Sequence, residues 1–176
     1  MNDLTKYNEN RDYMRTFDRL EWRSETAIGW LIREKTGAFV NHTGVIIKFK
    51  EFNRVFTSEA LGGGIDLNRL SDRLIDHKGE CFWYPLKPEY EKYRISLGQK
   101  MLDWEAVKYD YFSLFKQILF RVTFDASKLF CSEAPFLAGA YHNPPLPFPD
   151  EFKEYAPRPG YDMDKIGWWQ EGVRIL

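Results

Sequence analysis

The stretch that decides the fold is residues 39–61, which read FVNHTGVIIKFKEFNRVFTSEAL. Its two ends, residues 39–49 and 54–61, are rich in the β-branched and aromatic side chains that favour strands. Residues 51–53 separate the two segments, a length typical of a tight hairpin loop. The stretch therefore predicts a β-hairpin, with His42 opening the apolar part of the first strand and Glu59 late in the second.

The rest of the chain places strands first and helices afterwards. The expected strands are residues 27–32, 39–49, 54–61, 65–70 and 81–86. The expected helices are residues 8–25, a stretch that begins at Pro88, residues 109–122 and residues 132–141. Separate runs of strands and helices predict an α+β fold, with a sheet packed against helices.

Length and composition predict one domain over residues 1–176, because 176 residues with 44% hydrophobic side chains can bury a substantial core. A tail over residues 143–176 differs in composition. Six prolines lie between Pro144 and Pro159, which predicts a long extended wrap over the surface. Trp168 and Trp169 are expected to dock this tail.

Charge and hydropathy exclude several classes of protein. Lys and Arg number 25 and Asp and Glu number 26, which argues against a dedicated nucleic-acid binder. No apolar run reaches the length of a membrane span, and the first twenty residues lack the apolar centre of a secretory signal. We expect a cytoplasmic or passively released protein. Nothing in the sequence calls for a metal or an organic cofactor.

Cys131 lies in the setting LFCSEAP, residues 129–135. Pro135 suits only the first turn of a helix, Ser132 is a favourable N-cap, and Glu133 carries charge at the positive end of the helix dipole. These residues predict a helix that starts at or just after Cys131. A thiol at a helix N-terminus has a stabilised thiolate and can act as a nucleophile. An isolated cysteine between apolar residues is also commonly an inert core residue.

A thiolate nucleophile needs a base, normally histidine, and a group that orients the base. Of the three histidines, His77 lies in an expected turn and His142 at an expected helix end, whereas His42 heads a strand. Glu59 on the following strand could approach His42 across the hairpin. A structural histidine and a solvent-facing glutamate remain the alternative interpretation of these two residues.

Four segments in this order resemble a known family. They are VNHTGVII with His42, VFTSEA with Glu59, residues 108–111 (KYDY) and residues 130–133 (FCSE). Over roughly residues 27–141 the chain resembles the circularly permuted NlpC-type, papain-like cysteine hydrolases, the YiiX-like group, with lecithin:retinol acyltransferase as a more distant relative. In permuted members the His strand comes first and the Cys helix last. One departure is GWLI at residues 29–32, where the family often has Gly-Asp-Leu-Ile.

The resemblance implies a papain-like fold with an antiparallel sheet, a catalytic core over residues 27–141, and a role for each matching residue. Cys131 would be the nucleophile, His42 the general base and acid, and Glu59 the residue that orients His42. Tyr109 would line the site, with a possible part in holding the oxyanion. Backbone N–H groups at the start of the Cys helix, near Ser132, would supply the main oxyanion stabilisation.

The implied function is a cysteine hydrolase that cleaves an amide or ester through a thioester acyl-enzyme. Related families act on peptide amides of cell-wall fragments or on lipid-like acyl chains, so the substrate class is peptide, cell-wall fragment or lipid-like acyl group. The alternative is a non-catalytic module that keeps the fold and binds a peptide or lipid. Retention of both a nucleophile and a base favours the enzyme.

Overall fold

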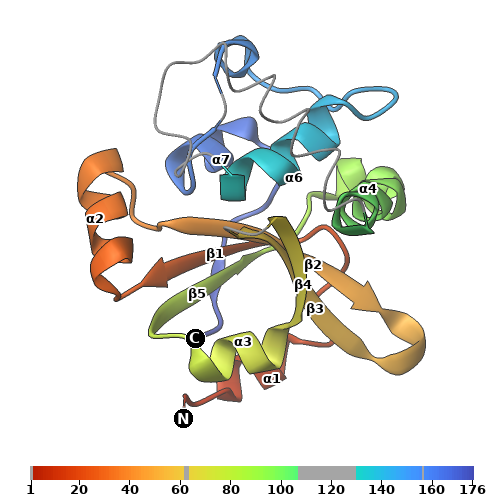
Figure 1. Cartoon of the computed structure of the whole chain (residues 1–176). Helices are drawn as coiled ribbons and strands as arrows, with labels where there is room; N and C mark the ends of the chain where they lie inside the picture. Colours follow the sequence, from red (N-terminus) through yellow and green to blue (C-terminus); the bar gives the residue numbers. More distant parts are fainter. Residues whose placement is uncertain (1, 62–63, 107–129, 156) are drawn as a thin grey trace.

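The protein is described here by a computed structural model, over residues 2–61, 64–106, 130–155 and 157–176. Within these ranges a six-stranded sheet has the order β4-β3-β2-β1-β5-β6, and every neighbouring pair of strands is antiparallel. Helices lie on both faces of the sheet, with α6 and α7 on one side and α1 and α3 on the other (Figure 1). The α+β prediction is confirmed.

The strands are β1 Arg19–Ser24, β2 His42–Phe49, β3 Arg54–Leu61, β4 Gly64–Arg69, β5 Gly79–Tyr84 and β6 Val173–Arg174. The α-helices are α1 Thr5–Asn10, α2 Ala27–Thr36, α3 Leu70–Asp76, α4 Arg94–Ala106, α6 Phe130–Ala140 and α7 Tyr161–Ile166. Short 3₁₀ helices are η1 Lys50–Phe52, η2 Pro88–Tyr93 and η3 Asp150–Lys153. Across the described ranges, none of the helices combines the length and the apolar character that a bilayer crossing requires.

The predicted hairpin is the pair β2 and β3, closed by η1 and by Asn53 in the left-handed conformation. Strand β2 is apolar along much of its length because both of its faces are covered. Val45 and Ile47 pack into a core with α4, α6 and α7, and Ile46 packs into a second core with α1 and α3. Successive side chains alternate between faces, so the hairpin separates two hydrophobic cores.

The helix predicted over residues 8–25 is wrong, because only α1 is helical and the segment continues into strand β1. Phe17 adopts the left-handed backbone conformation, φ 66°, which is incompatible with a continuous helix up to residue 25. Arg19 and Glu21 then point into the molecule, 0% and 1% exposed, and the Glu21 carboxylate accepts a hydrogen bond from the N–H of Gly160 at 2.9 Å. Charged residues are mostly solvent-exposed, so this buried pair made a central strand look like a polar helix.

The strand predicted over residues 27–32 is also wrong, because these residues open helix α2. The Thr26 side chain caps the helix by accepting from the N–H of Gly29 at 3.1 Å. Gly37 ends the helix in the left-handed conformation, φ 65°. The apolar run of residues 27–32 alone is typical of a strand, because the residues that mark the start and the end of the helix, Thr26 and Gly37, lie outside it.

The tail over residues 143–176 is less extended than its prolines predict. It contains η3, α7 and β6, and β6 adds a strand to the edge of the sheet beside β5. Trp168 and Trp169 are buried at 0% and 6% exposure. The indole N–H of Trp168 donates to the carbonyl of Pro147 at 2.6 Å, and that of Trp169 to the carbonyl of Phe17 at 3.1 Å. The two indoles thus join the tail to itself and to the segment just before β1.

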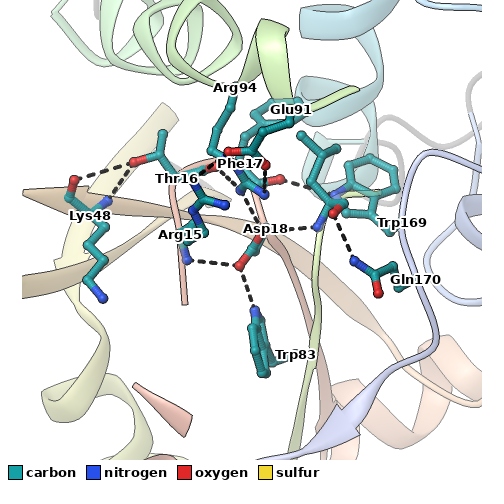
Figure 2. Close-up of polar contacts among 11 residues, drawn as sticks. Arg15, Thr16, Phe17, Asp18, Lys48, Trp83, Glu91, Arg94, Trp169 and Gln170 are labelled. Carbon is teal, nitrogen blue, oxygen red and sulfur yellow. Dashed lines mark hydrogen bonds and ion pairs between the residues drawn. The ribbon is translucent and has the colours of Figure 1, made fainter. Parts of the chain in front are cut away.

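Asp18 is a buried joint between β1, β5 and α4 (Figure 2). One carboxylate oxygen accepts from the Arg94 guanidinium at 2.6 Å and from the N–H of Leu86 at 3.0 Å. The other accepts from the Trp83 indole and the N–H of Arg15, both at 2.9 Å. Because its oxygens accept from side-chain and backbone donors that hold β1, β5 and α4 together, we infer that this carboxylate stabilises the fold.

Replacing Asp18 by Ala is expected to lower the free energy of unfolding by about 3–5 kcal/mol. It removes the buried partner of Arg94, which keeps only the partly exposed Glu91, and it leaves the indole of Trp83 without an acceptor. Urea unfolding of the variant measures this loss. The matched control is Asp72→Ala, which breaks an exposed ion pair with Arg69 and should cost no more than about 1 kcal/mol. Equal effects of the two substitutions would contradict the assignment.

Candidate active site

His42 and Glu59 meet across the hairpin. His42 is the first residue of β2, and the register places Gly44 directly opposite Glu59. Because side chains alternate along a strand, His42, Gly44 and Glu59 share one face. The Nε2 atom of His42 lies 2.7 Å from Oε2 of Glu59. The carboxylate is fully buried, while 16% of the His42 side chain remains exposed.

Cys131 reaches the same histidine from helix α6. It lies in the first turn of the helix and is 8% exposed. The sulfur is hydrogen-bonded to the His42 ring and to the backbone N–H groups of Thr43 and Ser132. Since Glu59 occupies Nε2 of the ring, the sulfur is left with the other nitrogen, Nδ1. The structure therefore brings together the three residues predicted as nucleophile, base and orienting group.

The charges of these three groups reinforce one another. Burial alone would raise the pKa of the Cys131 thiol, but the charge and hydrogen bond of His42 hold it below its usual value. Burial alone would lower the pKa of His42, but Cys131 and then Glu59 raise it to about 10. A lowered pKa for the thiol and a raised pKa for the imidazole both favour a thiolate–imidazolium pair, and the two groups titrate as one coupled system.

The structure contradicts the prediction that Ser132 is the N-cap of the Cys131 helix. Helix α6 begins at Phe130, so Ser132 is inside the helix and is not its N-cap. Its hydroxyl donates to the carbonyl of Pro157 at 2.6 Å and is occupied by the tail; only its backbone N–H faces the sulfur. Pro135 lies beyond the first turn, and the N–H that it lacks would have bonded to the carbonyl of Cys131. Tyr109 lies outside the described residues.

Arg73 on α3 is a site residue that the sequence did not indicate. Its Nε donates to Oε1 of Glu59 at 3.1 Å and its Nη2 to Oε2 at 2.9 Å. Burial would raise the pKa of Glu59, but the bonds from His42 and Arg73 lower it to about 2. The only signal is a basic residue in a short helix, which is an ordinary surface pattern.

The second thiol, Cys81, provides a contrast. It is fully buried in the core on the α3 side of the sheet. Burial, followed by the charge of Glu59, raises its pKa well above the usual value for a thiol. Such a cysteine behaves as an inert apolar residue. The two thiols of the chain therefore lie in opposite electrostatic settings.

The other two histidines serve local structure. His142 lies 2.7 Å from the hydroxyl of Ser96 through Nε2, and 2.8 Å from the carbonyl of Pro144 through Nδ1. His77 packs edge-on against Trp22, and burial lowers its pKa. Neither is among the groups that act on the Cys131 sulfur.

Comparison with known proteins identifies the fold but no family. No family model matches the chain, and no curated protein matches it. Among solved structures, the metalloprotein YiiX from Escherichia coli O157:H7 matches with a TM-score of 0.52 and 18% sequence identity. The chain has a YiiX-like fold. The match covers 72% of this chain and 65% of that protein, so the present chain spans about two thirds of its neighbour.

The neighbour is called a metalloprotein, which raises the question of whether this site suits a metal ion. Within the described ranges, no group of three or more His, Cys, Asp or Glu side chains is arranged to hold one. Glu59 is engaged by Arg73 on both oxygens, and Oε2 also faces His42. The described residues do not fit a metal centre.

Proposed function

We propose that the protein is a cysteine hydrolase of the papain-like, circularly permuted NlpC type. The observation that carries the proposal is the contact of Cys131 with His42, with Glu59 on the other ring nitrogen. A nucleophile, a base and an orienting carboxylate within mutual hydrogen-bond reach form the constellation of a thiol hydrolase. The chain order His42, Glu59, Cys131, with the helix after the hairpin, supports the permuted arrangement.

The proposed reaction begins with the Cys131 proton on His42. The thiolate attacks the carbonyl carbon of an amide or ester, and the resulting oxyanion lies near the first turn of α6. The first N–H groups of a helix have no partner inside that helix and can donate to such an oxygen. The imidazolium then gives its proton to the departing amine or alcohol, leaving a thioester. His42 then takes a proton from water, whose hydroxide attacks the thioester. The carboxylic acid leaves, and the thiolate of Cys131 and the imidazolium of His42 are restored.

Trapping of the acyl-enzyme tests this proposal. A p-nitrophenyl ester mixed with the protein should release a burst of one p-nitrophenol per chain and leave its acyl group on Cys131, as read by mass spectrometry. A short peptide amide and a long-chain acyl ester should then compete to different extents, which separates peptide from lipid-type substrates. Absence of the burst, or acylation of other residues in place of Cys131, would favour the binding-only alternative.

Gly44 is expected to matter for this activity because of its place opposite Glu59. A Cβ added at Gly44 would lie 2.8 Å from Cγ of Glu59, so the carboxylate would have to leave its position beside His42. We expect Gly44→Ala to lower kcat/KM on the order of 10²-fold, since small misplacements of catalytic groups have effects of that size.

A double-mutant cycle gives the control for this prediction. In a Glu59→Gln background the Gly44→Ala substitution should cost less than it does in the wild type, because the orientation of His42 is already lost. Additive losses from the two substitutions would mean that Gly44 acts through something other than Glu59.

A further inference from the structure

Glu59 is held from two sides. His42 meets its Oε2 at 2.7 Å, and Arg73 binds both oxygens at 3.1 and 2.9 Å. A two-point Arg–carboxylate contact fixes orientation as well as charge. The guanidinium also lies over the ring of Trp22, 5.3 Å from its centre, which limits the positions open to the arginine.

Arg73 approaches from the side of the sheet away from the nucleophile. Its helix, α3, packs through Leu70 and Leu74 into the core with α1, whereas α6 packs into the other core. Figure 1 shows the two helices on opposite faces of the sheet. Arg73 contacts Glu59 from the face opposite α6, so we take its effect on the chemistry to pass through Glu59.

A buried carboxylate needs compensation. Glu59 is fully buried, and a carboxylate with one neutral imidazole as its only partner would be costly to keep ionised. We propose that Arg73 is a positioning residue of this site: it holds Glu59 ionised and aligned with His42, and its charge balances that of the buried network. This inference rests on the proposed function, because it requires the Cys131–His42 pair.

The balance of charge gives the direction of the effect. With thiolate, imidazolium, carboxylate and guanidinium present, the network is neutral overall. Without Arg73 it carries one net negative charge, so forming the thiolate and deprotonating the imidazolium both become harder. Removing the arginine charge should therefore raise the pKa of both Cys131 and His42.

Other titratable groups near Arg73 and Glu59 do not change the net charge of this network. Cys81 faces Arg73 and Glu59 but stays a neutral thiol, because burial holds its pKa well above the usual value. His77 faces the same two residues, and burial followed by the charge of Arg73 lowers its pKa, which keeps it neutral at neutral pH. Glu21 has partners of its own on β1: its carboxylate accepts from the N–H of Gly160 at 2.9 Å and lies 3.7 Å from the Arg19 guanidinium.

The test uses two titrations of the full chain. Iodoacetamide alkylation of Cys131 against pH, read by mass spectrometry, gives the pKa of the thiol; NMR of the ring Cε1–H gives that of His42. Arg73→Gln should raise both values by about one unit, a tenfold change in proton affinity. Arg73→Lys keeps the charge and should leave both within a few tenths of the wild-type values.

Arg69→Gln is the matched control, because it removes one arginine charge near the start of α3 from an exposed ion pair and does not touch Glu59. It should move neither value. Unchanged values in Arg73→Gln would overturn the inference and leave the proposed function standing. A rise for Cys131 with a fall for His42 would also overturn it, since that pattern means that the pair has only loosened.

Failure of the proposed function has a different signature: wild-type Cys131 would titrate at or above the ordinary thiol value near 8.5. Should the glutamine variant not fold, Arg73→Met, which also removes the charge, takes its place. A rise of both pKa values by about one unit supports charge balance. Unchanged values in that folded variant overturn it.

Discussion

Replacing Cys131 by Ala is expected to lower hydrolysis of a p-nitrophenyl ester or a peptide amide by at least about 10³-fold. The thiolate is the atom that attacks in the proposed mechanism, and removal of a nucleophile leaves only binding and oxyanion stabilisation. Initial rates on an activated ester, with the burst amplitude, measure the loss. A variant that retains turnover would place the nucleophile elsewhere.

Cys81→Ala is the control for that experiment. Cys81 is the other thiol of the chain, fully buried and apart from the groups that act on Cys131. The variant should retain the burst and kcat/KM per folded molecule, with a modest loss of stability from the small cavity. Equal loss of activity in both variants would indicate damage to the fold in place of lost chemistry.

Replacing His42 by Ala should slow alkylation of Cys131 at pH 6.5 by about 100-fold or more. Burial raises the pKa of this thiol, and the His42 charge and hydrogen bond are what overcome it. Without the ring, the pKa should rise to or above the ordinary value near 8.5, so little thiolate remains at pH 6.5. Rates with iodoacetamide, resolved by peptide, measure the change.

The same charges set the pH range of activity in the wild type. Activity should rise as pH passes the lowered pKa of Cys131 and fall as the imidazolium loses its proton, close to the His42 pKa of about 10. A profile that declines near pH 7 would contradict the strong pairing of His42 with the sulfur and Glu59. His142→Ala is the control and should leave the pH profile unchanged. Its ring contacts Ser96 and Pro144, and it is not among the groups that act on Cys131.

The hairpin and its two polar residues could be predicted because local sequence carries their signals. An apolar strand headed by His42, a short loop and a second strand with Glu59 need only the alternation of side chains to be placed on one face. The contact with Cys131 is different in kind. It joins positions 89 residues apart. The order of the four segments, which resembles that of a known family, implies this contact, whereas the spacing between the residues does not.

Arg73 and strand β1 could not be predicted because their placement depends on packing. A single basic residue on a short helix looks solvent-exposed until the helix is laid against the sheet above Glu59. In β1, the buried charges of Arg19 and Glu21 reverse the usual link between polarity and exposure. The prediction of Ser132 as the N-cap is wrong because helix α6 starts at Phe130, one to two residues before the predicted start.

The most direct test of the central claim is the alkylation rate of both thiols of the native wild-type chain, measured from pH 5 to 9. The account predicts that Cys131 reacts with an inflection below the ordinary thiol value near 8.5, while Cys81 stays unreactive until the protein unfolds. An ordinary inflection at Cys131, or equal reactivity of the two cysteines, would contradict a thiolate held by His42.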